Sequence, residues 1–282
     1  MYGVFRLSQL GFVGAGKIVE VLTKGFVAAG VIQINNIWAS APLDQELQWI
    51  RQLGCNVSLK NADILEKNKL IILAVKPQIL PRVLEEIAPA VTEEHILLSV
   101  AAGITLSNIE RILPSKTRVA RIMTNTPVMF REGVSAFSMG SNVRPEDHEV
   151  IYRLMSSVGY CVEVKEDLMD TVTGFAGGGP AYLYTAIEAL ADGAVRGGLS
   201  RTVAVRMASQ MTIGAARMVQ ETGLHTSELK DAVCSPGGTT IVGVEALEKG
   251  GLRATLMDAV YAAANRAKEL GTLLNGNAIK SN

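Results

Sequence analysis

The stretch that decides the fold is Leu10-Gly11-Phe12-Val13-Gly14-Ala15-Gly16-Lys17-Ile18-Val19. Its apolar start is typical of a buried strand, and a tight glycine turn then leads into a helix-like sequence. Gly14 permits the turn, and Gly16 lets the backbone approach a phosphate group, at which the helix directs its free N–H groups and positive dipole end. The stretch therefore predicts a site for the pyrophosphate of a dinucleotide, although such a turn can also be purely structural. Val19 stands where a small residue is usual, so we expect slightly wider packing of helix on strand there.

The first half of the chain repeats this alternation of strand and helix. The predicted strands are Gln9–Val13, Ile34–Ala39, Leu70–Val75, Ile96–Val100 and Arg118–Ile122, with edge strands at Arg131–Ser138 and Cys161–Val164. The predicted helices between them are Lys17–Ala29, Leu43–Leu53, Ile79–Ile87 and Leu106–Leu113. Several strands are uninterrupted apolar runs, as expected when helices cover both faces of a sheet. Residues 1–166 are thus predicted to form an α/β domain, a doubly wound parallel sheet of the Rossmann type.

The second half has a different residue pattern, because strand-like apolar runs stop and alanine residues become frequent. Apolar stripes at helical spacing run from Tyr182 to Ala194 and from Ala204 to Met218, and further helices are predicted at Thr240–Leu247 and Leu252–Leu270. We interpret the Ala and Met stripes as helix–helix core rather than as a ligand surface. Residues 167–282 are therefore predicted to form an all-helical domain.

The composition limits the classes of function. Hydrophobic residues make up 48% of the 282 residues and charged residues 19%, which favours a buried core over disorder. The 27 Lys and Arg residues balance the 27 Asp and Glu residues, so no basic excess suggests nucleic acid as a partner. Three scattered cysteines and three distant histidines predict no disulfide framework, a reducing compartment and no metal. Without a signal peptide or an apolar run near the ~20 residues of a membrane span, we expect a soluble, cytoplasmic protein with no membrane partner.

The ends of the other predicted strands extend the cofactor site. The second strand ends without an acid for the ribose 2′-hydroxyl and without an arginine for a 2′-phosphate, but Ser40 and the backbone near Ala41 offer hydrogen bonds to a phosphate. This favours NADPH and leaves NADH open. Lys76 either faces the cofactor cleft or is a solvated surface charge. The predicted cofactor contacts are Phe12, Gly14, Ala15, Gly16, Lys17, Ile18, Ser40, Ala41, Asn61, Ala74, Val75, Lys76, Pro77, Ala101 and Ala102.

Two glycine clusters stand out in the helical half. One is Gly174-Phe175-Ala176-Gly177-Gly178-Gly179-Pro180-Ala181-Tyr182, and the other is Ser235-Pro236-Gly237-Gly238-Thr239-Thr240. Each precedes a helical stretch and can present backbone N–H groups to an anion, and a small carboxylate substrate suits the second. The alternative is that both are connecting turns, with Thr239 or Thr240 as a helix N-cap.

These motifs together resemble the pyrroline-5-carboxylate reductases. The matching segments are Gly11–Gly16, Ala74–Pro77, Ala101–Gly103, Met123–Pro127, Gly179–Tyr182 and Ser235–Thr240, in family order over almost the whole chain. The segment Leu247-Glu248-Lys249-Gly250-Gly251 follows the last of them, and this combination is highly specific. The resemblance is nearest to the cytosolic animal form, because no extended C-terminal tail follows. Ala176 and Gly178 replace the usual serines and Val19 the usual alanine, and none of these changes removes a group expected to do chemistry.

The resemblance implies a reaction, a site and an assembly. The reaction is reduction of the C=N bond of 1-pyrroline-5-carboxylate to L-proline by hydride from NADPH or NADH, the last step of proline biosynthesis. Thr240 would hydrogen-bond the substrate nitrogen, and the backbone N–H groups of Gly238 and Thr239 would hold the substrate carboxylate. The helical domains would interlock as homodimers, which gather into larger rings such as a decamer, with each active site completed across the dimer.

Two other interpretations stay open at this point. A related two-domain reductase could act on another imine or on a β-hydroxyacid, but β-hydroxyacid enzymes usually need a helix lysine, and none stands out early in the helical half. A non-catalytic dinucleotide sensor would keep the Gly14 turn but would have no reason to keep Pro236-Gly237-Gly238-Thr239-Thr240.

Overall fold

The structure is a computed structural model that describes residues 5–279. By packing, the chain forms two compact units. Unit 1 contains the residues up to Gly178 and those from Tyr261 onward, and unit 2 is Gly179–Val260. The division predicted after residue 166 falls inside unit 1 by this measure.

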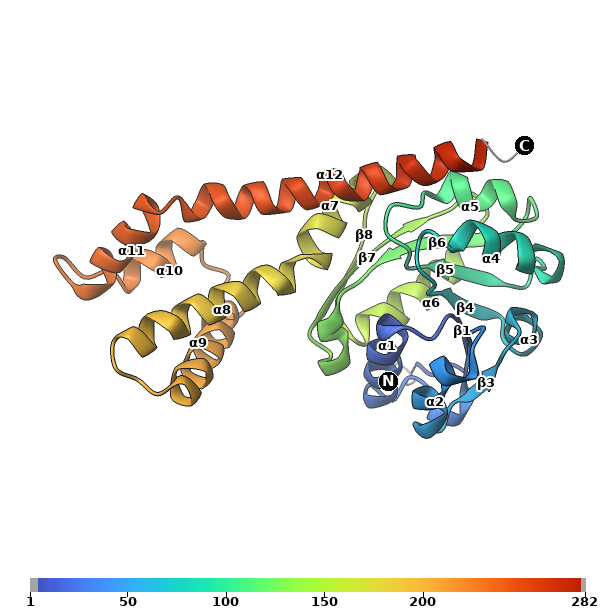
Figure 1. The fold of residues 1–282 in the computed structure, drawn as a ribbon, viewed down its shortest axis with the longest axis horizontal. Helices are drawn as coiled ribbons and strands as arrows, with labels where there is room; N and C mark the ends of the chain where they lie inside the picture. The colour runs from blue at the N-terminus through green and yellow to red at the C-terminus, as the bar shows by residue number, and fades with distance from the viewer. Residues whose placement is uncertain (1–4, 280–282) are drawn as a thin grey trace. The chain divides into compact units, whose positions relative to one another are not determined.

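The centre of unit 1 is an eight-stranded sheet in the order β3-β2-β1-β4-β5-β6-β7-β8. Most of its strands are labelled in Figure 1. Neighbouring strands are parallel except for β6 and β7. The strands are β1 (Leu10–Val13), β2 (Ile37–Ser40), β3 (Asn56–Ser58), β4 (Leu70–Leu73), β5 (Ile96–Ser99), β6 (Arg118–Met123), β7 (Gly133–Met139) and β8 (Gly159–Glu163). The strands β2 and β3 lie on one side of β1, and the strands from β4 onward lie on the other side. Doubly wound sheets bind their ligands at such a point, where the strand order changes direction.

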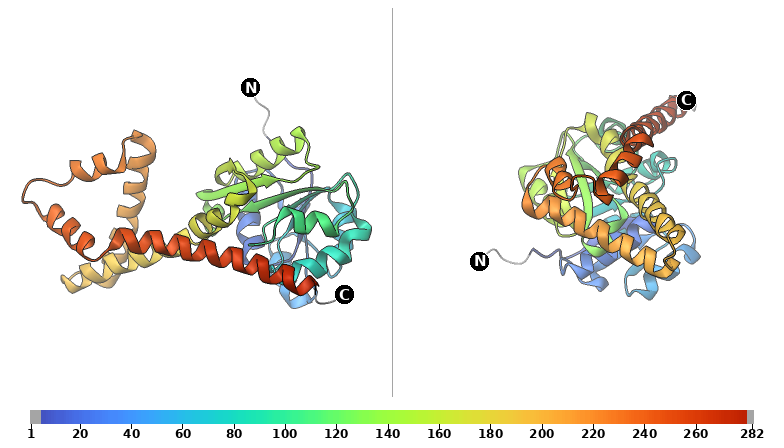
Figure 2. Two further views of the ribbon diagram at one scale, coloured as in Figure 1. Left: turned by 90° about the horizontal axis from the view of Figure 1, so that it is seen from above. Right: turned by 90° about the vertical axis from the view of Figure 1, so that its left-hand side faces the viewer.

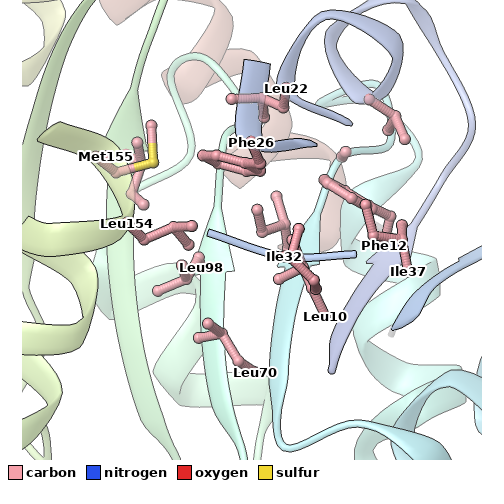
Figure 3. Packing of buried hydrophobic residues seen from close by; sticks show 14 of the residues in the cluster. Leu10, Phe12, Leu22, Phe26, Ile32, Ile37, Leu70, Leu98, Leu154 and Met155 are labelled. Atoms are coloured by element: carbon pink, nitrogen blue, oxygen red, sulfur yellow. The ribbon is translucent and has the colours of Figure 1, made fainter. Parts of the chain in front are cut away.

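Helices cover both faces of this sheet, as predicted. One face carries α1 (Lys17–Ala28), α2 (Asp44–Gln52) and α6 (Pro145–Ser156), and the other carries α3 (Asn61–Lys67), α4 (Leu80–Ile87) and α5 (Leu106–Ile112). Alternate residues of β1 show the division, because Phe12 packs in the first cluster and Val13 in the second. Figure 3 shows Phe12 in the first cluster together with Phe26 of α1 and Leu154 of α6. Each fully buried side chain of this size contributes roughly 1.5–3 kcal/mol to folding.

The sequence prediction missed some elements and shifted others. The segment Ile34–Asn36 forms a 3-10 turn, so β2 begins only at Ile37. Strand β3 and helices α3 and α6 were not predicted. A buried ion pair ties α6 to the sheet, because Arg118 Nη1 lies 2.7 Å from Asp147 Oδ1 and both side chains are at most 9% exposed.

Unit 2 is helical, which confirms the predicted change from strands to helices. Its helices are α8 (Gly179–Arg196), α9 (Arg201–Thr222), α10 (Thr226–Ala232) and α11 (Thr239–Lys249), and α12 (Leu252–Ile279) continues into unit 1 past its predicted end at Leu270. Figure 2 shows α8 and α9 as neighbouring helices, and small buried residues, Ala191, Ala204 and Ala208, form their contact.

The large residues of the predicted apolar stripes are mostly uncovered within one chain. Met207 is 58% exposed, Met211 55% and Met218 51%, and further exposed apolar side chains lie on α8, α11 and α12. In a single chain, the buried alanines of these stripes therefore form helix–helix core, as predicted. The methionines do not, because they are exposed to solvent. Apolar surface of this extent is typical of a subunit interface.

Candidate active site

Four predicted cofactor segments lie at one edge of the sheet. The register aligns Val13 with Ser40 and with Leu73, and Leu73 with Ser99, so these parallel strands end side by side. Two hydrogen bonds continue the alignment into the loops, from Gly14 N to Ser40 O at 2.9 Å and from Ala74 N to Val13 O at 2.8 Å. The structure thus brings together the glycine turn, Ser40-Ala41, Ala74–Pro77 and Ala101-Ala102 at the carboxyl ends of the strands, where open α/β sheets bind ligands.

The two glycines of the turn have different physical roles. Gly14 has a φ of +114°, and a Cβ atom there would lie 2.7 Å from Ala74 O, so both the backbone and the neighbouring loop require glycine. Gly16 has an ordinary φ of −82° and is exposed, and a Cβ atom there would meet nothing within 4 Å. Gly14 therefore builds the turn, while Gly16 leaves space beside it.

The turn and the start of α1 present a row of unused backbone donors. Gly16 caps the helix, and its carbonyl accepts from Val19 N at 3.0 Å and from Glu20 N at 3.2 Å. None of the hydrogen bonds described for residues 5–279 uses the four N–H groups that precede Val19, which belong to Ala15, Gly16, Lys17 and Ile18. Lys17 adds a cationic side chain, which pairs with Glu20 at 2.9 Å. Free N–H groups at the positive end of a helix dipole form an anion site.

The end of β2 holds a short hydrogen-bonded chain of polar groups. Ser40 is fully buried, and its hydroxyl donates to Asn61 Oδ1 at 2.7 Å, while Asn61 Nδ2 donates to Glu86 at 3.1 Å. Asn61 is half-buried, so its side chain stands between Ser40 and solvent. Phe12 is fully buried in the core, which leaves only its backbone for any contact with a cofactor.

The loop after β4 places the predicted lysine on the surface. Lys76 is exposed, and its carbonyl accepts from Ile79 N and Leu80 N, so its backbone closes the turn into α4. Within the described residues its side chain forms no ion pair. Ala41, Ala74 and Ala101 are buried, whereas Val75, Pro77 and Ala102 are half-buried. The small side chains leave the backbone of these strand ends as the surface that a flat ring can lie against.

In unit 2, the second glycine cluster leads directly into α11. Gly237 has a φ of +65°, Gly238 is the N-cap, and the helix begins at Thr239. The Gly238 N–H donates to Ser235 O at 3.0 Å, so the described bonds leave the N–H groups of Thr239 and Thr240 free at the helix start. Both threonine side chains are exposed. This loop therefore offers backbone donors and one or two hydroxyl groups to an anion.

The first glycine cluster does not form such a site. Thr173–Gly177 is a π-helical turn that α8 follows directly, and the Gly178 N–H donates to Thr173 O at 3.2 Å. The buried Asn125 side chain fixes this turn, because its Nδ2 donates to Ala176 O at 3.0 Å and its Oδ1 accepts from Val134 N at 3.0 Å. The expectation of free N–H groups is wrong here, because the segment is already helical.

Two of the cysteines and one of the histidines lie in surroundings that suit a structural role. Burial raises the pKa of the Cys55 thiol to about 11 and that of the Cys161 thiol to about 12, so neither is an activated nucleophile. His95 is buried, and its ring nitrogens lie 2.9 Å from Thr92 N and 3.0 Å from Leu65 O. No cluster of metal-ligating residues occurs in the described part of the chain.

Comparison with known proteins decides the family. The chain is 45% identical over 262 residues to rat pyrroline-5-carboxylate reductase 3, an alignment that covers 93% of this chain and 96% of the relative. The chain belongs to the pyrroline-5-carboxylate reductase family. Human pyrroline-5-carboxylate reductase 2 is 42% identical over 271 residues, with 94% of this chain and 84% of the relative covered. As a member of this family, the chain is an oxidoreductase.

Family models and a solved structure agree with this assignment. Residues 9–103 match the model of coenzyme F420-dependent NADP oxidoreductases, and residues 166–270 match the model of pyrroline-5-carboxylate reductase dimerisation. The crystal structure of a pyrroline carboxylate reductase from Plasmodium falciparum with NADP bound aligns with a TM-score of 0.87 at 32% identity, over 95% of this chain and 99% of that one. Pyrroline-5-carboxylate reductases thus share both the Rossmann-type sheet and the helical domain described above.

None of the helices in residues 5–279 combines the length and the apolar character needed to cross a bilayer.

Proposed function

We propose that this chain reduces 1-pyrroline-5-carboxylate to L-proline with hydride from a nicotinamide dinucleotide. The 45% identity to a pyrroline-5-carboxylate reductase over 93% of the chain is the observation that carries the proposal. The hydride adds to the carbon of the protonated C=N bond, whose electron pair moves to nitrogen and leaves a secondary amine. A protonated imine is already a strong electrophile, so positioning the ring supplies much of the lowering of the barrier.

The sheet edge of unit 1 supports the cofactor part of the proposal. The row of free N–H groups from Ala15 to Ile18 would hold the pyrophosphate. The segments Ala74–Pro77 and Ala101-Ala102 would lie beside the nicotinamide and its ribose. When bound, the dinucleotide supplies the hydride from its nicotinamide ring.

We favour NADPH over NADH as the dinucleotide. Strand β2 ends at Ser40 and Ala41-Pro42 follows, with no acid to bind a ribose 2′-hydroxyl, and Asn61, oriented by Ser40, offers an amide group at this position. The relative from Plasmodium falciparum is a complex with NADP, which supports the same choice. The ratio of kcat/KM for NADPH to that for NADH tests it, and a ratio below one contradicts it.

The loop before α11 supports the substrate part of the proposal. The Thr240 hydroxyl would hydrogen-bond the substrate nitrogen, orient the ring and help to move its proton. The expected contact from the Gly238 N–H is replaced here, because that group already donates to Ser235 O. The N–H groups of Thr239 and Thr240 would instead hold the substrate carboxylate at the positive end of α11, in a turn that Gly238 shapes. The loop Ser235–Thr240 contains no carboxylate or imidazole side chain, which agrees with this mechanism because the substrate needs little proton transfer.

Replacement of Thr240 by valine tests this role with nearly the same side-chain volume. We predict that Thr240→Val leaves the affinity for the dinucleotide unchanged and lowers kcat/KM for the substrate ~10-fold or more, a loss above ~1.4 kcal/mol of transition-state stabilisation. Thr255→Val is the matched control, because Thr255 is an exposed threonine of α12 outside the loop. Unchanged kinetics in Thr240→Val would remove Thr240 from the mechanism.

The match to the dimerisation model indicates a homo-oligomer. We propose that dimers of interlocked helical domains form it and gather into a larger ring such as a decamer. The exposed apolar residues of α8, α9 and α11 supply surface for such contacts. The dimerisation match from residue 166 onward also supports a domain division between residues 166 and 167.

We propose a cytoplasmic location, because the three cysteines are free thiols that suit a reducing compartment. Fractionation of cells that express the chain would test this, and recovery with another compartment would contradict it.

A further inference from the structure

A tryptophan of α2 reaches the glycine turn. Trp49 Nε1 donates a hydrogen bond to Ala15 O at 3.0 Å, and its half-buried ring packs against the core cluster that includes Phe12. A buried indole N–H usually finds an acceptor, but here the acceptor is a carbonyl within the proposed pyrophosphate site. The chain has two tryptophans, and the other, Trp38, packs against the core on the opposite face of the sheet.

The Ala15–Gly16 peptide has little else to fix its orientation. Gly14 is held by its bond to Ser40 O, and the Gly16 carbonyl is held by the first turn of α1. Between them, the Ala15 carbonyl accepts from Trp49, and the described hydrogen bonds include none from the Ala15 or Gly16 N–H. Gly16 has no Cβ atom, and the space around its Cα is open, so sterics oppose a rotation of this peptide only weakly.

The direction of this carbonyl sets the direction of a donor. In a trans peptide the C=O of one residue and the N–H of the next point in opposite directions. The Trp49 bond holds the Ala15 carbonyl toward α2 and thereby directs the Gly16 N–H to the other side, into the row of free donors. A rotated peptide would present the carbonyl oxygen there instead, which would repel a phosphate.

We propose that Trp49 is a positioning residue that holds the Ala15–Gly16 peptide with its N–H toward the pyrophosphate of the cofactor. The proposal rests on the proposed function only in so far as a dinucleotide binds at this turn. It makes the anion site partly dependent on a side chain 34 residues further along the chain, on a different helix.

The test is Trp49→Phe, which keeps an aromatic ring and removes the N–H donor. Trp38→Phe is the matched control, because it makes the same replacement on the other face of the sheet. Binding of ADP-ribose, which contains the pyrophosphate, and of adenosine, which lacks it, is measured for all three proteins by calorimetry or ligand-observed NMR. Trp49→Phe should lower the affinity for ADP-ribose about 3- to 10-fold, which corresponds to the loss of one hydrogen bond. It should leave the affinity for adenosine unchanged. In turnover, KM for the dinucleotide should rise by the same factor, with kcat and KM for the imine unchanged.

Several results would overturn the proposal. If Trp49→Phe lowers the affinities for adenosine and ADP-ribose equally, Trp49 only supports the fold. If the affinity for ADP-ribose is unchanged, the hydrogen bond from Trp49 to Ala15 has no role in binding. If Trp49→Phe does not fold, the Trp38→Phe protein still gives an answer, because Trp49 is then its single tryptophan. ADP-ribose should change its fluorescence and adenosine should not, and identical responses would contradict the proposal. Failure of the wild-type chain to bind ADP-ribose at all would instead count against the cofactor site itself.

Discussion

Gly16→Ala separates cofactor binding from folding more cleanly than any other change in the turn. Within the protein the substitution costs little, because the φ of −82° suits alanine and the new methyl group meets no atom within 4 Å. The lower entropy of the unfolded chain favours alanine by ~0.4–1 kcal/mol, while alanine is a poorer N-cap than glycine by a similar amount. These effects offset each other, so the free energy of unfolding should change by less than about 0.5 kcal/mol.

The same methyl group occupies the space that a pyrophosphate needs. Displacing the phosphate from the free N–H groups removes at least one hydrogen bond to a charged group, worth about 1.5–3 kcal/mol. Dinucleotide affinity should therefore fall roughly 10- to 150-fold. Calorimetric titration and urea unfolding of the same preparation measure both quantities. Gly14→Ala is the contrasting variant, because its positive φ and the 2.7 Å approach to Ala74 O should destabilise the fold itself. An unchanged affinity in Gly16→Ala would refute the placement of the pyrophosphate.

Three further predictions concern a buried ion pair, the cysteine thiols and the subunit interface. Asp147→Asn removes the negative charge that lies 2.7 Å from the buried Arg118, which leaves the guanidinium charge uncompensated. This should lower the free energy of unfolding by about 3–5 kcal/mol in urea titrations, and a loss below about 1 kcal/mol would contradict the assigned ion pair. The raised pKa values, about 11 for Cys55 and about 12 for Cys161, keep both thiols protonated at pH 8, so iodoacetamide should modify Cys234 first in the native protein. Rapid native labelling of all three thiols would show that these pKa values are wrong. Light scattering should give a mass of at least twice the 30.1 kDa chain, and a monomer would contradict the interface.

Much of the fold was predictable because its signals are local. Uninterrupted apolar runs predict strands such as Leu70–Leu73, and the glycine turn predicts where the first helix begins. Strand β3 was missed because it is three residues, Asn56–Ser58, at the sheet edge and carries no apolar run. The start of β2 was placed too early because Ile34 has a strand-forming side chain but lies in a 3-10 turn.

The candidate site was predictable in position but not in detail. The sequence indicates which strand ends meet, since parallel strands share one carboxyl edge. It does not show that Ser40 is buried behind Asn61, or that the Gly238 N–H is engaged by Ser235, because both depend on local geometry. The bond from Trp49 joins α2 to the turn before α1 and leaves no pattern in the spacing of residues. The glycine-rich sequence Gly174–Gly178 also led to a wrong prediction of an open loop, because the segment forms a helical turn.

The most direct test of the central claim is turnover of 1-pyrroline-5-carboxylate by the purified chain. Oxidation of NADPH should depend on both the imine and the enzyme, and one L-proline should form for each dinucleotide consumed. Absence of proline formation with both NADPH and NADH, in a preparation that is folded and binds ADP-ribose, would contradict the account.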